Sequence, residues 1–164
     1  MTFTEEVAWV TGSSTGIGRA CAVALAKEGC RVAVHYNRSE EEAREVVEEI
    51  GSSGGEALLV GGDVADAGEV GRMVGEIEDR FGRLDLLVNN AGSLIERRSF
   101  EEMTEDLWDR VMNVNLKSIY LCSRAVLPLM KRRGGGRIIN MTSVAARSGG
   151  GPGSPSPTLP PKPV

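Results

Sequence analysis

Short apolar runs alternate with longer amphipathic stretches along most of this 164-residue chain. The runs are VAWVTG (7–12), RVAVHY (31–36), EALLVGGDV (56–64), LDLLVNNAG (84–92) and RIINMTSV (137–144). Strands that are largely apolar on both faces, separated by crossover helices, predict a parallel sheet covered on both sides. We therefore expect a doubly wound, Rossmann-like α/β fold, with ligands bound beyond the strand ends where the first and fourth strands meet.

The amphipathic stretches carry helix signals at their ends. Ser39 and Asp66 are each followed three residues later by glutamate, which is the spacing of a capping box. Thr104 is expected to cap a long helix that runs to about Arg133, where cations and then glycines favour a helix end. These signals predict crossover helices between the strands.

Composition excludes several classes of function. A net charge of −4 argues against a surface for nucleic acid or for an anionic membrane. The three cysteines have no paired spacing, so we expect neither disulfides nor a metal site. No apolar run reaches the roughly 18 residues of a membrane span, and the N-terminus is acidic where a signal peptide is basic. A cytoplasmic protein is the resulting expectation.

A glycine-rich turn, TGSSTGIG (11–18), follows the first predicted strand. Gly12 would allow a sharp turn, Gly16 close approach of a pyrophosphate, and Gly18 close packing of the next helix. Many α/β proteins use such turns only for packing. At this position we predict a cofactor-binding turn whose contributing residues are Gly12, Ser14, Thr15, Gly16, Ile17 and Gly18.

A second motif, NNAG (89–92), follows the fourth predicted strand. Together with the glycine-rich turn, it resembles the short-chain dehydrogenase/reductase family over about residues 5–150. The resemblance implies strand order 3-2-1-4-5, an NAD(P) cofactor and hydride transfer to or from a small carbonyl or secondary alcohol. Substrates like those of 3-oxoacyl reductases and of sugar or alcohol dehydrogenases are both open. Full-length relatives are expected to be homodimers or homotetramers.

The resemblance also implies roles for single residues. Asp63, followed by Val64, matches an adenine-contacting aspartate, Asn115 an active-site asparagine and Ser143 a catalytic serine. The remaining cofactor-binding residues from the second motif are Asn90, Ala91 and Gly92. Structural roles remain open for three of these side chains. Asn90 could only tie loops together, Asn115 could only hydrogen-bond within a bent helix, and Ser143 could only be a polar strand end.

The end of the second strand bears on cofactor choice. An NAD-selective site places an acidic residue there to bind the ribose 2′-hydroxyl. Tyr36 occupies that position, and Arg38 could pair with a 2′-phosphate, which favours NADP over NAD. Thr15 weakens this preference, because many NADP-dependent relatives carry a basic residue at that position. Arg38 could also be a solvated charge at the helix entry.

The proton donor implied by the resemblance is missing. It is a tyrosine followed four residues later by a lysine, on the helix after the fifth strand. The only tyrosines, Tyr36 and Tyr120, lie earlier, and the sole histidine, His35, is interpreted as a packing or loop contact. Loss of the donor removes on the order of 3–5 kcal/mol of transition-state stabilisation. A catalytically inactive, dinucleotide-binding fragment is therefore the alternative function.

Six of the seven prolines lie in the final segment, 149–164, so we expect an incomplete Rossmann domain over 1–148 and a disordered Gly/Pro-rich tail. With free choice of third codon positions, residues 155–164 can be encoded by a string whose shifted frame reads Val-Ala-Tyr-Ala-Ala-Ala-Lys-Ala-Gly. That string contains Tyr-x-x-x-Lys, so we hypothesise a frameshift or sequencing error near residue 153. A natural proline-rich linker or SH3 ligand is the alternative.

A chain truncated after its fifth strand would leave that strand as an open apolar edge. The long helix would also keep an uncovered face. We therefore expect this chain to associate with itself or to aggregate.

Overall fold

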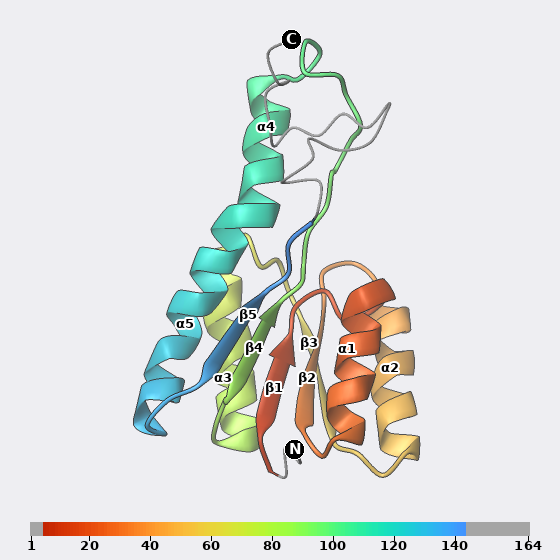
Figure 1. The fold of residues 1–164 in the computed structure, drawn as a ribbon, viewed down its shortest axis with the longest axis vertical. Helices are drawn as coiled ribbons and strands as arrows, with labels where there is room; N and C mark the ends of the chain where they lie inside the picture. Colours follow the sequence, from red (N-terminus) through yellow and green to blue (C-terminus); the bar gives the residue numbers. More distant parts are fainter. Residues whose placement is uncertain (1–4, 144–164) are drawn as a thin grey trace.

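The computed structural model describes residues 5–143. Five strands form one sheet in the order β3-β2-β1-β4-β5 (Figure 1). They are β1 (Val7–Val10), β2 (Arg31–Tyr36), β3 (Ala57–Gly61), β4 (Leu86–Asn89) and β5 (Arg137–Asn140). Every pairing is parallel. The predicted doubly wound sheet and its strand order are therefore confirmed.

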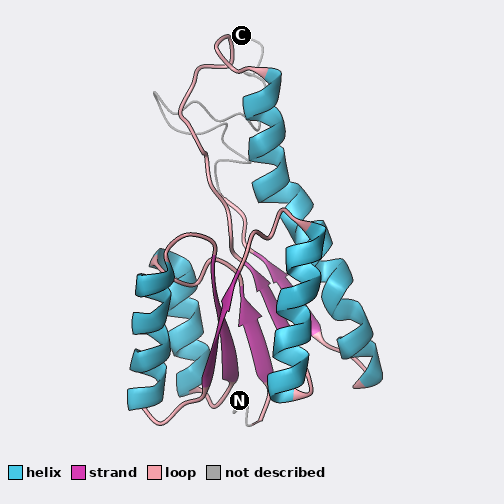
Figure 2. Cartoon of the chain, turned by 180° about the vertical axis from the view of Figure 1, so that it is seen from behind, coloured by secondary structure: helices cyan, strands magenta, loops and turns pink. Residues whose placement is uncertain are grey.

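Helices cover both faces of the sheet (Figures 1 and 2). They are α1 (Gly16–Lys27), α2 (Glu40–Ser52), α3 (Ala67–Phe81), α4 (Glu105–Met112), the π-helical segment η1 (Asn113–Lys117) and α5 (Ser118–Arg132). The α1 and α2 helices bury residues such as Val46 against Val10 and Val34. On the opposite face, α3 and α5 pack over Trp9 and Leu87. Strands β1 to β4 thus form the apolar middle layer that the sequence predicts, whereas the residues of β5 are exposed.

The predicted helix caps are found at two of three positions. Asp66 accepts hydrogen bonds from the amides of Gly68 and Glu69 at the start of α3, and Thr104 Oγ1 accepts one from Leu107 at the start of α4. The capping box at Ser39 is wrong, because this N-cap side chain makes no capping hydrogen bond. Ser39 instead lines the cavity described below.

Asp85 joins the beginnings of β1 and β4. Its Oδ2 accepts from the Val7 amide (2.9 Å) and from Arg83 Nε (2.7 Å), and its Oδ1 accepts from Arg83 Nη2 (2.8 Å). Burial by itself raises the pKa of this carboxyl group, but the hydrogen bonds from Arg83 and Val7 outweigh it and hold the pKa below its usual value. Asp85 therefore stabilises the fold in its charged form.

We predict that Asp85→Asn lowers the free energy of unfolding by about 1–2 kcal/mol at pH 7. Because the folded-state pKa is depressed, the charged group's contribution is present above the unfolded value of about 3.9 and is lost as the pH falls through the folded value. Urea unfolding at pH 7 and at pH 3 measures both effects. The exposed Asp79→Asn serves as the control, and equal stability of Asp85→Asn and the unaltered chain at pH 7 would contradict the prediction.

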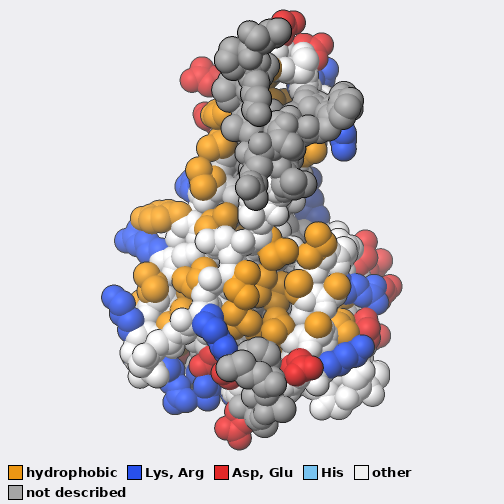
Figure 3. All heavy atoms as spheres, viewed as in Figure 1, with side chains coloured by type: hydrophobic (Ala, Val, Ile, Leu, Met, Phe, Trp, Pro, Cys, Tyr) orange, Lys and Arg blue, Asp and Glu red, His pale blue; other side chains and the backbone are white. Residues whose placement is uncertain are grey.

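Apolar side chains are exposed on β5 and on the long helix. Ile138 and Ile139 are 37% and 47% exposed, and among the described strands β5 pairs with β4 alone. Figure 3 shows hydrophobic side chains gathered on the face of the sheet seen in that view. Leu116, Tyr120 and Leu127 are exposed along η1 and α5. These exposures support the expected self-association, which stays a prediction.

Candidate functional site

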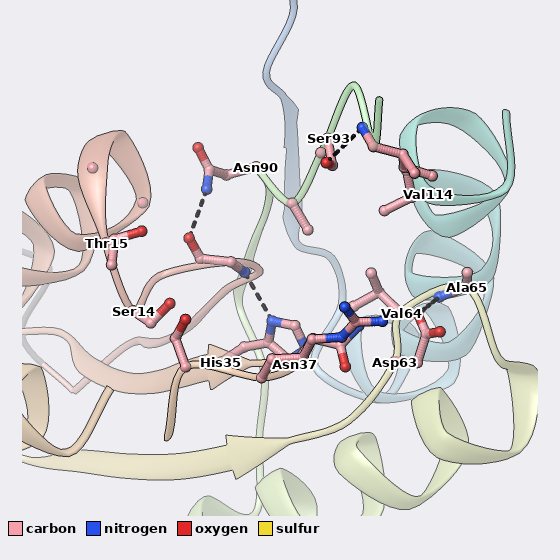
Figure 4. Close-up of a pocket in the computed structure, with 18 of the residues that line it drawn as sticks. Ser14, Thr15, His35, Asn37, Asp63, Val64, Ala65, Asn90, Ser93 and Val114 are labelled. Atoms are coloured by element: carbon pink, nitrogen blue, oxygen red, sulfur yellow. Dashed lines mark hydrogen bonds between the residues drawn. The ribbon is translucent and has the colours of Figure 1, made fainter. Parts of the chain in front are cut away.

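A cavity of about 960 Å³ lies at the carboxyl ends of the strands, where β1 and β4 are neighbours (Figure 4). Its walls come from the glycine-rich turn after β1, the segment after β2, the loops after β3 and β4, and the helix α4 with η1. Most of the predicted cofactor-binding residues line it: Gly12, Ser14, Thr15, Gly16, Ile17, Gly18, Arg38, Asp63, Val64, Asn90, Ala91 and Gly92. This is the switch point at which the fold predicts a ligand.

The backbone of the glycine-rich turn leaves no room for a side chain at Gly12 or Gly18. Gly12 has φ +64°, and a Cβ there would lie 3.0 Å from the Cα of Ala91. A Cβ at Gly18 would lie 2.2 Å from the carbonyl oxygen of Gly12. Gly16 has φ +56°, faces open space and begins α1, whose N-cap Thr15 makes no side-chain capping bond. The start of α1 is thus a suitable place for an anion such as a pyrophosphate.

Asn90 ties the loop after β4 to the glycine-rich turn. Its Nδ2 donates to the carbonyl oxygens of Thr11 (2.9 Å) and Gly12 (3.0 Å). In return, Thr11 Oγ1 accepts from the amides of Asn90 (2.9 Å) and Ala91 (3.0 Å). Both side-chain amide protons of Asn90 are therefore directed at the turn, so this residue shapes the cavity wall.

Asn115 lies in η1, a departure from the regular helix expected between Thr104 and Arg133. Its Nδ2 donates to the carbonyl oxygen of Val111 (2.8 Å), which a regular α-helix would offer to the backbone amide of residue 115. The next turn is widened, and the Ser118 amide donates to the Asn113 carbonyl five residues back. The expected single helix from Thr104 to about Arg133 is therefore wrong in this detail, because the π-helical segment η1 interrupts it at Asn115.

The same side chain also holds the loop after β4. Asn115 Nδ2 donates to the carbonyl oxygen of Ser93 (2.7 Å), and its Oδ1 accepts from the Ser93 amide (3.1 Å). Ser93 lines the cavity. Asn115 therefore fixes one wall of the cavity through Ser93. The sequence alone places this asparagine in a helix and does not show its contact with Ser93.

At the end of β2, Arg38 lines the cavity, whereas Tyr36 does not. Tyr36 is not among the residues that line the cavity, because its ring packs over Gly61, where a Cβ would lie 2.6 Å from its hydroxyl oxygen. Arg38 lines the cavity together with Asn37 and Ser39. Sequence reasoning missed Asn37 and Ser39 as candidates, although their position directly after a strand at the switch point was a usable signal.

Neither of the two predicted catalytic residues, Asn115 and Ser143, is among the residues that line the cavity, and neither is Tyr120. Ser143 follows β5 and is exposed, and Asn140 of β5 accepts from Asn89 Nδ2 (2.9 Å). Tyr120 is 58% exposed on α5, and its hydroxyl accepts from Arg124 Nη1 (3.3 Å). Among residues 5–143, no tyrosine lines the cavity.

Within 5–143, no group of three or more His, Cys, Asp and Glu side chains is arranged to hold a metal ion. Nor does any helix of this part of the chain have the length and apolar character needed to cross a membrane. Cys30 and Cys122 are unpaired, and burial raises their pKa values to about 11 and about 12, which makes them poor nucleophiles.

Strand order, glycine-rich turn and cavity position together define a nucleotide-binding α/β protein of the Rossmann type. Within that class, the chain belongs to the short chain dehydrogenase family, whose family model matches residues 6–155.

Relatives carry a more specific name. A 3-oxoacyl-(acyl-carrier-protein) reductase of Synechocystis sp. is 46% identical over 146 residues, which cover 89% of this chain and 59% of the relative. The reductase FabG of Staphylococcus aureus is 45% identical over 142 residues, or 87% of this chain and 57% of the relative. That of Staphylococcus epidermidis is 44% identical over 145 residues, with coverages of 88% and 59%. The chain thus spans less than two thirds of the length of these relatives.

Proposed function

We propose that this chain binds NADP(H) in the cavity and forms the nucleotide-binding part of an oxidoreductase. The cofactor would exchange a hydride with a small-molecule carbonyl or secondary alcohol, and the names of the relatives favour a 3-oxoacyl thioester. The observation that carries the proposal is the convergence of the glycine-rich turn, the Asp63 loop and Arg38 on one cavity. Each of them suits a different part of a dinucleotide.

The cavity residues fit the three parts of the cofactor. The start of α1 would take the pyrophosphate, because Gly16 faces open space there. The loop with Asp63 and Val64 would take the adenine, and Asp63 Oδ1 accepts from the Ala65 amide (2.9 Å), which fixes the carboxylate in the wall. Arg38 would take the 2′-phosphate, because a guanidinium group can pair with it through two hydrogen bonds.

We predict that Arg38→Ala weakens NADPH binding by about tenfold or more and leaves NADH binding within about twofold, because only NADPH carries the 2′-phosphate. Fluorescence titration of the reduced nicotinamide measures both dissociation constants. Arg44→Ala is the matched control, since Arg44 is an exposed arginine of α2 that pairs with Glu40 (2.5 Å) outside the cavity lining. An equal effect of Arg38→Ala on both cofactors would refute an NADP preference based on this residue.

A second candidate function, binding without turnover, is favoured by the positions of the tyrosines. A carbonyl that accepts a hydride needs a proton donor, and neither Tyr36 nor Tyr120 lines the cavity. Ser143 could supply a hydrogen bond to the carbonyl oxygen but not the phenol–lysine pair. The second candidate is therefore that the 164-residue chain binds NADPH without reducing ketones.

Two measurements on the same sample separate the candidates. The first is NADPH binding, and the second is NADPH consumption at 340 nm with a panel of ketones and 3-oxoacyl thioesters. Binding without consumption supports the second candidate, and robust consumption supports the first. Residues 144–164 lie outside the described residues, so the domain boundary and the reading-frame hypothesis stay predictions, and the nucleotide sequence tests the latter.

A further inference from the structure

His35, the last buried residue of β2, connects two loops of the cavity. It is 1% exposed, and its ring Nδ1 accepts from the amide of Gly12 (2.8 Å; Figure 4). Its Nε2 lies 2.9 Å from the carbonyl oxygen of Gly62, in the loop after β3. The His35 backbone adds two bonds to Ser13, donating to its Oγ (2.8 Å) and accepting from its amide (2.9 Å). The histidine is the loop contact that the sequence predicts.

The two ring contacts determine the protonation of His35. The Gly12 amide can only donate, so Nδ1 must lack a proton, and the Gly62 carbonyl can only accept, so Nε2 must carry one. The neutral Nε2–H tautomer is the form that satisfies both loops. Burial lowers the pKa of His35 below its usual value, against smaller opposite effects of the Gly62 carbonyl and the Asp63 carboxylate. The ring is therefore neutral at pH 7.

We propose that His35 is a positioning residue for the dinucleotide, because its imidazole sets the spacing between the glycine-rich turn and the Gly62–Val64 loop. The proposal rests on the proposed function, in which the turn holds the pyrophosphate and the loop holds the adenine. These parts of a dinucleotide are joined covalently, so the two loops must be preorganised at a matching distance. A rigid ring with one acceptor and one donor on separate nitrogens provides such a spacer.

The glycine-rich turn also depends on His35 for its own conformation. Gly12 has φ +64° and directs its amide at the ring instead of at a strand neighbour. A buried amide that loses its acceptor is costly, so the turn would rearrange without the imidazole. Rearrangement at Gly12 would also disturb Asn90, which donates to the Gly12 carbonyl oxygen, and Gly18, where an added Cβ would lie 2.2 Å from that oxygen.

The test compares two substitutions of matched shape with the unaltered 164-residue chain. In His35→Asn, the side-chain carbonyl oxygen lies as many bonds from the backbone as Nδ1 does in histidine, so an acceptor for Gly12 is kept. In His35→Leu, the side chain has the same shape as asparagine but no polar group. We expect His35→Leu to weaken NADPH binding by about tenfold or more. His35→Asn should recover only part of this loss, because Asn keeps the acceptor for Gly12 but has no donor at the position of Nε2 to reach Gly62. Trp9→Phe is the control for a general loss of stability, because Trp9 contacts the ring edge and its buried Nε1 has no hydrogen-bond partner among residues 5–143.

A measurement without cofactor keeps the inference testable if the leucine variant does not fold. His35 is the only histidine of the chain, so ¹⁵N-labelled histidine gives one pair of ring signals. We expect a protonated Nε2 and an unprotonated Nδ1 at pH 7. An Nδ1–H tautomer, or NADPH binding unaffected by His35→Leu, would overturn this inference alone. Failure of the unaltered chain to bind NADPH would overturn it together with the proposed function.

Discussion

Replacing Gly18 with alanine is expected to abolish measurable NADPH binding and to lower the free energy of unfolding by about 3 kcal/mol. The added Cβ would lie 2.2 Å from the carbonyl oxygen of Gly12 and 2.5 Å from Asn90 Nδ2. Neither atom is at the end of a flexible side chain that could move away. The Gly12 oxygen is backbone, and Asn90 is held by its two hydrogen bonds to Thr11 and Gly12. The turn must therefore open, and the pyrophosphate site is lost with it.

Urea unfolding and NADPH titration measure the two effects of Gly18→Ala. Gly71→Ala is the matched control, because Gly71 is exposed on α3 and a Cβ there meets nothing within 4 Å. That substitution should raise stability by about 0.5–1 kcal/mol, since alanine is the better helix former. A Gly18→Ala chain that binds NADPH as tightly as the unaltered chain would show that the turn is not the binding element.

The parts of the fold that follow from local patterns were predictable. Apolar runs separated by helices indicate a parallel sheet, and the positions of Gly12 and Gly18 indicate the turn, because both signals are contained in a few consecutive residues. The caps at Asp66 and Thr104 are local in the same way and are confirmed. The cap at Ser39 failed because spacing alone does not fix which way a side chain turns, and this one lines the cavity.

Features that depend on strand register or on distant contacts were not predictable. Tyr36 pairs with Gly61 across β2 and β3, and the missing Cβ of Gly61 leaves room for the tyrosine ring. The sequence does not specify that register, so it could not show that Tyr36 lies outside the cavity lining. The bond between His35 and Gly62 likewise joins residues 27 positions apart. The fold class is thus encoded locally, whereas the orientation of side chains in the cavity is set by tertiary packing.

Asn115→Ala is expected to lower the free energy of unfolding by about 2–3 kcal/mol, the second largest effect we predict. The substitution removes the hydrogen bonds to both backbone groups of Ser93 and to the Val111 carbonyl. Since the side chain occupies the Val111 carbonyl, its loss should let η1 return toward a regular α-helix and free the loop after β4. Urea unfolding measures the stability, and hydrogen exchange at the Ser93 amide measures the release of the loop.

Two further variants separate this role of Asn115 from a general effect of altering η1. Asn113→Ala, at an exposed position of the same segment, should change stability by less than about 0.5 kcal/mol. Asn115→Asp should be at least as damaging as Asn115→Ala, although its shape is unchanged, because a carboxylate oxygen would then face the carbonyl oxygens of Ser93 and Val111. An aspartate variant as stable as the unaltered chain would mean that the amide group, and with it the link to Ser93, does not hold this wall of the cavity.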